Sequence, residues 1–100
     1  MIKVNVNYDN NIIKSFEVKG HANFNEYGKD IVCASVSSIV ITSINLALEI
    51  DEKAVTYKQD EGLISVTINK NDDVTNKIFI NMVNMLKELE EQYKDNIKIM

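Results

Sequence analysis

Apolar and polar residues alternate along the first 19 residues, which predicts two extended segments. From Met1 to Tyr8, one side of the alternation carries Ile2, Val4, Val6 and Tyr8. The stretch from Ile12 to Lys19 places Ile12, Phe16 and Val18 on one face. Asp9-Asn10-Asn11 stands between the two segments, and these residue types tolerate tight turns. We therefore expect a β-hairpin at the start of the chain.

Two later segments carry the spacing of helices. From Ile31 to about Ile50 the chain is largely apolar, and its polar residues recur three or four positions apart, which predicts a largely buried helix with one wetted face. That polar stripe consists of Ser35, Ser38, Thr42, Asn45 and Glu49. A long final helix starts at Asn71-Asp72-Asp73, where acidic residues suit the helix dipole. Its apolar stripe consists of Ile78, Met82, Met85, Leu86, Leu89 and Tyr93.

A second hairpin is expected between the helices. Ala54–Lys58 and Leu63–Asn69 are rich in strand-forming residues, and the chain turns between them near Gly62. The predicted order is ββαββα, in an α+β fold built as a two-layer sandwich. An antiparallel sheet would have two helices on one face. One hundred residues without an internal linker predict a single domain over residues 1–100.

The composition narrows the classes of function. Apolar residues make up 45% of the chain and charged residues 26%, which is typical of a globular domain. The net charge is −4, and the chain has no Arg with which to grip phosphate or guanine in two places, so we expect no nucleic-acid partner. No apolar run approaches the ~20 residues of a membrane-spanning helix, so we expect no membrane partner either. A single Cys excludes an internal disulfide, which favours a cytoplasmic location.

The one cysteine and the one histidine suggest chemistry through their positions. Cys33 lies about three residues into the first predicted helix, where free amides and the helix dipole favour the nucleophilic thiolate. His21 lies in the irregular stretch 20–30, which is long enough to fold back over the helix start. A Cys–His pair at a helix N-terminus is the arrangement of a thiol hydrolase. Backbone amides near Val32–Ala34 would then donate to the developing oxyanion.

Simpler explanations exist for the same residues. A free Cys in an apolar helix is often an inert core residue, and a single loop His often lies on the surface. One Cys and one His cannot complete a four-ligand zinc site within one chain, so we expect no metal and no cofactor. A zinc site shared between two chains stays open.

Neighbouring residues could support a site at Cys33. Ser37 is four positions after Cys33 and shares its helix face, although its hydroxyl could instead bond a carbonyl one turn back. Asp30 suits the helix N-cap and could alternatively orient His21. Gly20 and Gly28 could supply positive φ angles or allow a bound peptide to approach closely.

A combined motif in this region resembles that of a known family. Gly20-His21-Ala22 is followed by Tyr27-Gly28-Lys29-Asp30-Ile31-Val32-Cys33-Ala34 and then by Ser37. The pattern of GHA followed by G-x-DIVCA-x-x-S resembles the Prp family of ribosomal-processing cysteine proteases. The chain length and the ββαββα order also agree with that family.

The resemblance implies a bacterial endopeptidase that removes the N-terminal extension of large-subunit ribosomal protein twenty-seven, after a short hydrophobic, aromatic-containing motif. It implies that His21 and Cys33 form the catalytic dyad and that Asp30 and Ser37 line the same site. It also implies a homodimer and a mobile loop over the site at about residues 22–28.

Two alternatives remain beside the protease. One is a non-catalytic ribosome-assembly adaptor that binds the same peptide without cleaving it. The other is an RNA-binding protein, which net acidity and the absence of Arg disfavour.

Overall fold

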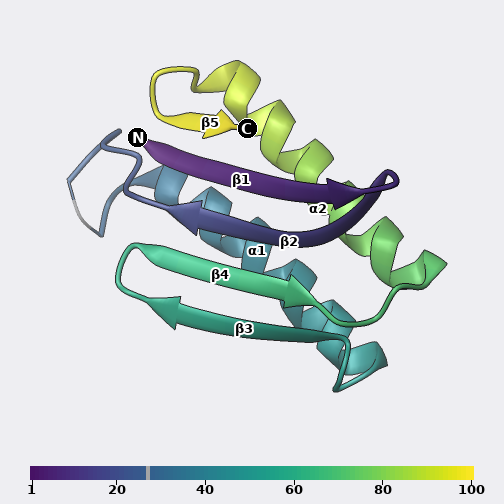
Figure 1. The fold of residues 1–100 in the computed structure, drawn as a ribbon. Helices are drawn as coiled ribbons and strands as arrows, with labels where there is room; N and C mark the ends of the chain where they lie inside the picture. The colour runs from purple at the N-terminus through teal and green to yellow at the C-terminus, as the bar shows by residue number, and fades with distance from the viewer. Residues whose placement is uncertain (27) are drawn as a thin grey trace.

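The computed structural model describes residues 1–26 and 28–100 (Figure 1). Within these residues the order of elements is β1 Ile2–Asp9, β2 Ile12–Lys19, α1 Ile31–Ile50, β3 Val55–Asp60, β4 Leu63–Ile68, α2 Asp73–Gln92 and β5 Ile97–Ile99. Both helices lie behind the sheet in Figure 1, so the α+β sandwich with two helices on one face is confirmed.

The sheet differs from the prediction by one strand. Its order is β3-β4-β2-β1-β5, and the first four strands pair antiparallel as expected. The fifth strand, β5, pairs parallel to β1 with Ile97 opposite Ile2, so the sheet is mixed and the order is ββαββαβ. Three residues are too few for an alternating pattern to mark a strand. The pairing places the first and the last strand of the chain side by side (Figure 1).

A β-bulge changes the inward face of the first hairpin. The register between β1 and β2 shifts after Asn7, because Asn7 pairs with Ser15 while Tyr8 pairs with Ile13. The extra residue of the bulge is Lys14, and it reverses the alternation before it. Ile13 is therefore 1% exposed, where the pattern had placed Ile12 inward, and Tyr8 is 53% exposed.

Helix α1 is less buried than predicted. The side chains of Leu46 and Ile50 are 49% and 54% exposed, outside the expected polar stripe. A two-layer fold covers a helix only from the sheet and from one neighbouring helix, so its outer half faces solvent.

By length and composition, Ile31–Ile50 would suffice to cross a membrane, with a mean hydropathy of 2.0. The sequence expectation had considered only uninterrupted apolar runs, and Ser, Thr and Asn residues interrupt this one. In the structure one third of this segment is buried inside the fold, and its buried apolar residues belong to the shared core.

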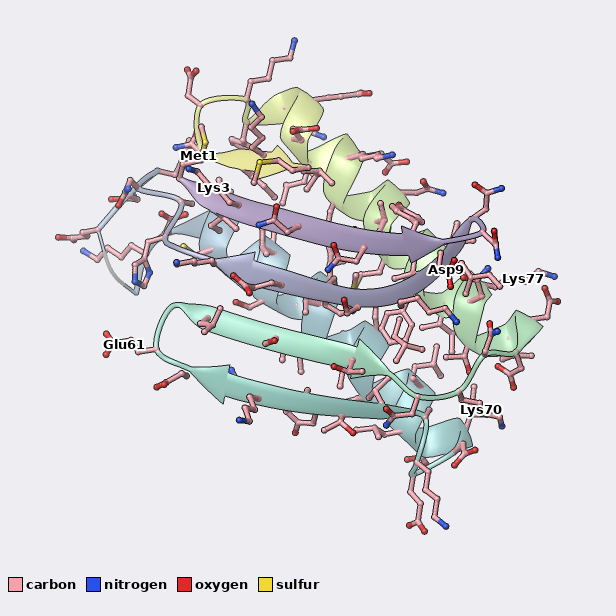
Figure 2. The ribbon with its side chains drawn as sticks, in the orientation of Figure 1. Met1, Lys3, Asp9, Glu61, Lys70 and Lys77 are labelled. Atoms are coloured by element: carbon pink, nitrogen blue, oxygen red, sulfur yellow. The ribbon has the colours of Figure 1, made fainter. Side chains whose placement is uncertain are left out.

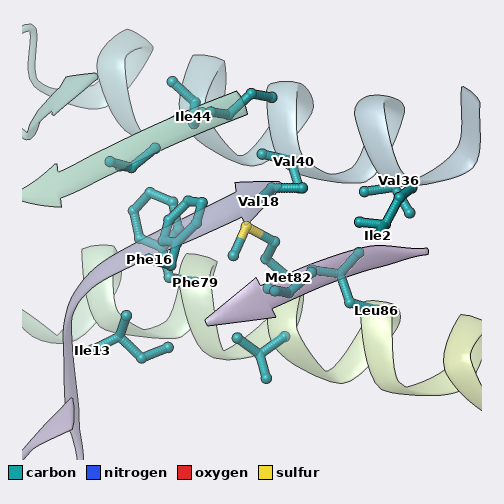
Figure 3. Packing of buried hydrophobic residues seen from close by; sticks show 14 of the residues in the cluster. Ile2, Ile13, Phe16, Val18, Val36, Val40, Ile44, Phe79, Met82 and Leu86 are labelled. Carbon is teal, nitrogen blue, oxygen red and sulfur yellow. The ribbon is translucent and has the colours of Figure 1, made fainter. Parts of the chain in front are cut away.

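Helix α2 is rotated relative to its predicted stripe. Phe79 and Val83 are buried, although the spacing had left them out, whereas Met85 is 43% exposed. Phe79 packs on Phe16 of β2 with ring centroids 5.5 Å apart (Figure 3). Such a pair adds about 0.5–1.5 kcal/mol beyond the area that it buries. Met82 and Leu86 continue the same buried face, as predicted.

Candidate active site

A cleft of about 690 Å³ lies where three segments meet at one end of the sheet. The segments are the loop after β2, the first two turns of α1 and the turn between β3 and β4. All of the residues proposed from the sequence line this cleft: Gly20, His21, Gly28, Asp30, Cys33, Ala34 and Ser37. In Figure 2, Glu61 marks the β3–β4 turn at the same end of the molecule as Met1.

The side chain of Asp30 accepts hydrogen bonds from two segments of the cleft, the start of α1 and the loop before it. Its Oδ1 accepts the N–H groups of Val32 and Cys33 at 2.9 and 3.0 Å, which caps helix α1. Its Oδ2 accepts the N–H groups of Phe24 and Asn25 at 2.9 and 3.2 Å, which ties down the loop. Burial opposes ionisation of this carboxyl, but the four backbone donors outweigh that cost and hold the pKa of Asp30 below its ordinary value. Both oxygens accept backbone N–H groups, so in this structure Asp30 acts as a cap and a loop anchor.

Cys33 is half-buried and lines the cleft. Its Sγ accepts a hydrogen bond from the N–H of Ala22 at 3.3 Å, so the loop residue next to His21 lies against the sulfur. The side chain also packs partly on the hydrophobic core. One side of the Cys33 side chain is therefore held by core residues, and another side faces the cleft.

The exposed imidazole of His21 lies against the β3–β4 turn. A Cβ at Gly62 would approach His21 Nε2 to 3.3 Å, so the ring occupies the space that a larger residue would fill. Among the described residues, the imidazole has no hydrogen bond to the Cys33 sulfur. A proton could pass between the two only if the ring turned toward the sulfur, and such loose geometry is common in proteins without a bound ligand.

The glycines at the cleft have different roles. Gly20 has a φ of +97°, and a Cβ there would lie 2.5 Å from the carbonyl oxygen of Met1. A glycine at this position lets the backbone at Met1 approach closely, so glycine is needed here for the fold and not for chemistry. Gly28 has a φ of +86° and open space around it. The loop predicted to be mobile, 22–28, includes residue 27, which lies outside the described residues.

The hydroxyl of Ser37 differs from those of Ser35 and Ser43 on the same helix. Ser35 and Ser43 donate to carbonyl oxygens one turn back, at 2.7 and 2.8 Å. Ser37 is exposed and lines the cleft one turn after Cys33. Its position suits a contact with a bound substrate.

The helix-start amides are already occupied, which corrects the expected oxyanion donors. The N–H groups of Val32 and Cys33 bond to the Asp30 side chain, and that of Ala34 bonds to the Asp30 carbonyl at 3.1 Å. Ala34 therefore contributes to the cleft wall, while its amide serves the helix. A helix cap and an oxyanion site compete for the same donors, which helix position alone could not reveal.

Sequence reasoning missed two contacts made by the segment that follows α2, residues 93–96. The side-chain amide of Asn96 donates to the carbonyl of Ala22 at 3.0 Å, and the ring of Tyr93 meets that of Phe24 edge-on at 5.2 Å. Both link residues about 70 positions apart, and periodicity carries no information at that separation.

No three His, Cys, Asp or Glu side chains gather as a set for a metal ion within residues 1–26 and 28–100.

The sequence matches one family over nearly its whole length. The model of the family described as cysteine protease Prp matches residues 1–98. The chain belongs to this family. A ribosomal processing cysteine protease Prp of Staphylococcus aureus is 32% identical over 83 residues, which are 80% of this chain and 78% of that protein. The protein of the same name in Bacillus subtilis is 31% identical over 94 residues, which are 87% and 84% of the two chains.

The fold agrees with a solved structure of the same family. A Prp from Staphylococcus aureus, in complex with a covalently linked product peptide, superposes with a TM-score of 0.92 and 28% identity. The match covers 99% of this chain and 97% of that one. The chain is therefore a cysteine protease of the Prp family, whose named relatives act in ribosomal processing.

Proposed function

We propose that this cysteine protease uses Cys33 as its nucleophile and His21 as its general base. The observation that carries the proposal is the shared cleft, which brings the single thiol and the single imidazole of the chain to its walls. A covalently linked product peptide in a structure of a family member supports a nucleophilic mechanism.

The reaction would proceed in two balanced stages. His21 takes the thiol proton, and the sulfur attacks the scissile carbonyl carbon. The C–N bond then breaks, and the amine leaves with the proton from His21. In the second stage His21 takes a proton from water, whose oxygen attacks the thioester carbonyl carbon. The C–S bond then breaks, the new carboxyl end leaves, and the sulfur takes the proton back from His21.

We propose that the substrate is the N-terminal extension of large-subunit ribosomal protein twenty-seven. The family motif at Gly20–Ser37 and the naming of the relatives as ribosomal processing proteases support this choice. The apolar part of the cleft wall, formed by Ile2, Val18, Val36, Leu63 and Ile64, suits a hydrophobic, aromatic-containing cleavage motif. Large apolar side chains exposed on the helix layer, such as Leu46 and Ile50, are consistent with a homodimer. A ribosomal protein as substrate would place the enzyme in the cytoplasm.

Peptide cleavage tests the function directly. Purified protein is mixed with a peptide that spans the junction between the N-terminal extension and the mature ribosomal protein, and mass spectrometry identifies the products. Light scattering on the same protein gives its mass in solution and so tests the homodimer. We expect one cleavage product pair for the unaltered protein and none for Cys33→Ala or His21→Ala. Ser38→Ala changes an exposed serine outside the cleft and should retain activity.

The results separate the protease from the adaptor. Cleavage by Cys33→Ala at the normal rate would overturn the proposed nucleophile. Saturable binding of the peptide without any product from the unaltered protein would favour the adaptor.

A further inference from the structure

The loop that carries His21 contacts residues 93–96, which lie about 70 positions later in the chain. Besides the hydrogen bond from Asn96 Nδ2 to the carbonyl of Ala22, the edge-on contact of Phe24 with Tyr93 joins the same two segments. We call residues 93–96 the C-terminal turn. Two independent contacts therefore place this turn under the loop.

The backbone of Asn96 is held by hydrogen bonds on both sides. Its backbone N–H donates to the carbonyl of Tyr93 at 2.9 Å, and its carbonyl accepts the N–H of Ile2 at the same distance. Ile97, the next residue, is fully buried in the core. The side chain of Asn96 is thus held between the end of α2 and the first strand.

Ala22 is the residue through which this anchor reaches the sulfur. Its side chain is 1% exposed, and its N–H donates to Cys33 Sγ. That N–H belongs to the peptide bond formed with His21, so the backbone of His21 lies next to the sulfur even while its ring rests against Gly62. The hydrogen bond from Asn96 to Ala22 fixes the backbone next to His21. The imidazole ring can still turn about its side-chain bonds.

We infer that Asn96 is a positioning residue of the active site, acting through Ala22, and this inference rests on the proposed function. Asn96 fixes the N–H that donates to the nucleophilic sulfur and the backbone from which His21 reaches it. A donor at the sulfur matches the needs of a thiolate nucleophile, and a fixed attachment point for the base reduces the orientational entropy lost in the reaction.

Asn96→Asp is the sharpest test, because it keeps the shape of the side chain and replaces the donor by an oxygen facing the Ala22 carbonyl. We expect faster hydrogen exchange at the Ala22 amide, by about three- to tenfold, the factor that one hydrogen bond supplies. We also expect kcat to fall by at least about tenfold, with a smaller change in KM, since displaced catalytic groups act on the reaction step.

Asn69→Asp is the matched control. Asn69 also donates through Nδ2, to Thr56 Oγ1 at 2.8 Å, but on the second hairpin outside the cleft. It should leave exchange at Ala22 and kcat unchanged. Equal effects of the two variants, or an unchanged Ala22 amide in Asn96→Asp, would overturn the inference.

A second variant covers the case in which Asn96→Asp fails to fold. Phe24 is 45% exposed, so Phe24→Ala loosens the same attachment without disturbing the core. It should speed exchange at Ala22 in the same direction, and unchanged exchange would count against the anchor. The exchange measurement needs no substrate, so failure of the anchor is distinguishable from failure of the proposed cleavage.

Discussion

Asp30 shows how one side chain serves both local structure and the site. A cap of helix α1 alone would need one carboxylate oxygen, whereas here the second oxygen holds two amides of the loop. The carboxyl is 9% exposed, so water cannot readily replace these bonds. The helix start and the loop are therefore linked through a single residue.

Asp30→Asn should separate these two roles. An Asn side chain still accepts the helix amides through its one oxygen, but its NH₂ group faces the loop amides as a second donor. We expect a loss of about 1–3 kcal/mol in the free energy of unfolding, measured with urea, from the loss of hydrogen bonds to a charged group. We also expect faster hydrogen exchange at Phe24 and Asn25.

Asp72→Asn is the control for that variant. Asp72 caps helix α2 through Thr75 N–H at 2.9 Å and, in the part of the chain that the structure describes, accepts no loop amide. It should cost less stability and leave exchange at Phe24 and Asn25 unchanged. Equal losses from the two variants would contradict the double role of Asp30.

The charge of Asp30 also sets the direction of a pH effect. Because the pKa of the folded carboxyl is lowered, its ionised form stabilises the protein at pH values above its ordinary pKa of about 3.9. That contribution is lost as the pH falls through the folded pKa. Urea unfolding measured from pH 7 downward should therefore show a steeper acid loss in the unaltered protein than in Asp30→Asn.

At the scale of elements, the turn between β3 and β4 sets the resting place of the His21 ring. Gly62 has a φ of +69° and leaves the space in which the imidazole lies. The turn therefore contributes a surface to the cleft as well as a connection between strands.

Gly62→Ala should displace that ring. The left-handed backbone costs a non-glycine residue about 1–2 kcal/mol, and the added methyl group approaches His21 Nε2. Gly28→Ala has the same backbone penalty with open space around it. We expect the NMR signals of the His21 ring to shift in Gly62→Ala and to stay in place in Gly28→Ala. Equal shifts in both variants would show that backbone strain, rather than contact, moves the ring.

The elements were the part most readily predicted from sequence. Strand β2 and helix α1 have the expected bounds, because long periodic segments with a clear cap at Asp30 mark their own limits. The bulge at Lys14 and the rotation of α2 were missed, since each depends on how neighbouring elements pack. The gathering of His21, Cys33 and Asp30 in one cleft followed from short separations along the chain. The contact of Asn96 with Ala22 spans 74 positions and follows only from the complete fold.

At the scale of the whole molecule, β5 closes the sheet and supports the C-terminal turn. Ile97 is 0% exposed and pairs with Ile2 at the start of the chain. Glu90 of α2 accepts the N–H of Ile99 at 2.8 Å, which holds the strand to the helix layer. The three residues of β5 therefore connect the sheet to the helix layer.

Ile97→Ala should destabilise the protein by about 2–5 kcal/mol, the range for truncating a buried Ile. Urea unfolding measures the loss. Ile99→Ala, at a half-buried position of the same strand, should cost less. A loss from Ile97→Ala no greater than that from Ile99→Ala would indicate that β5 contributes little to the core.

The parallel pairing of β5 with β1 also determines when the site can form during synthesis. Ile2 is synthesised long before its pairing partner Ile97. His21 and Cys33 are made well before the turn at residues 93–96 and the strand β5 that hold their loop. Since domains fold as units, a nascent chain would carry both reactive side chains before it could align them. Proteolytic competence would then arise only after residues 93–99 have been made.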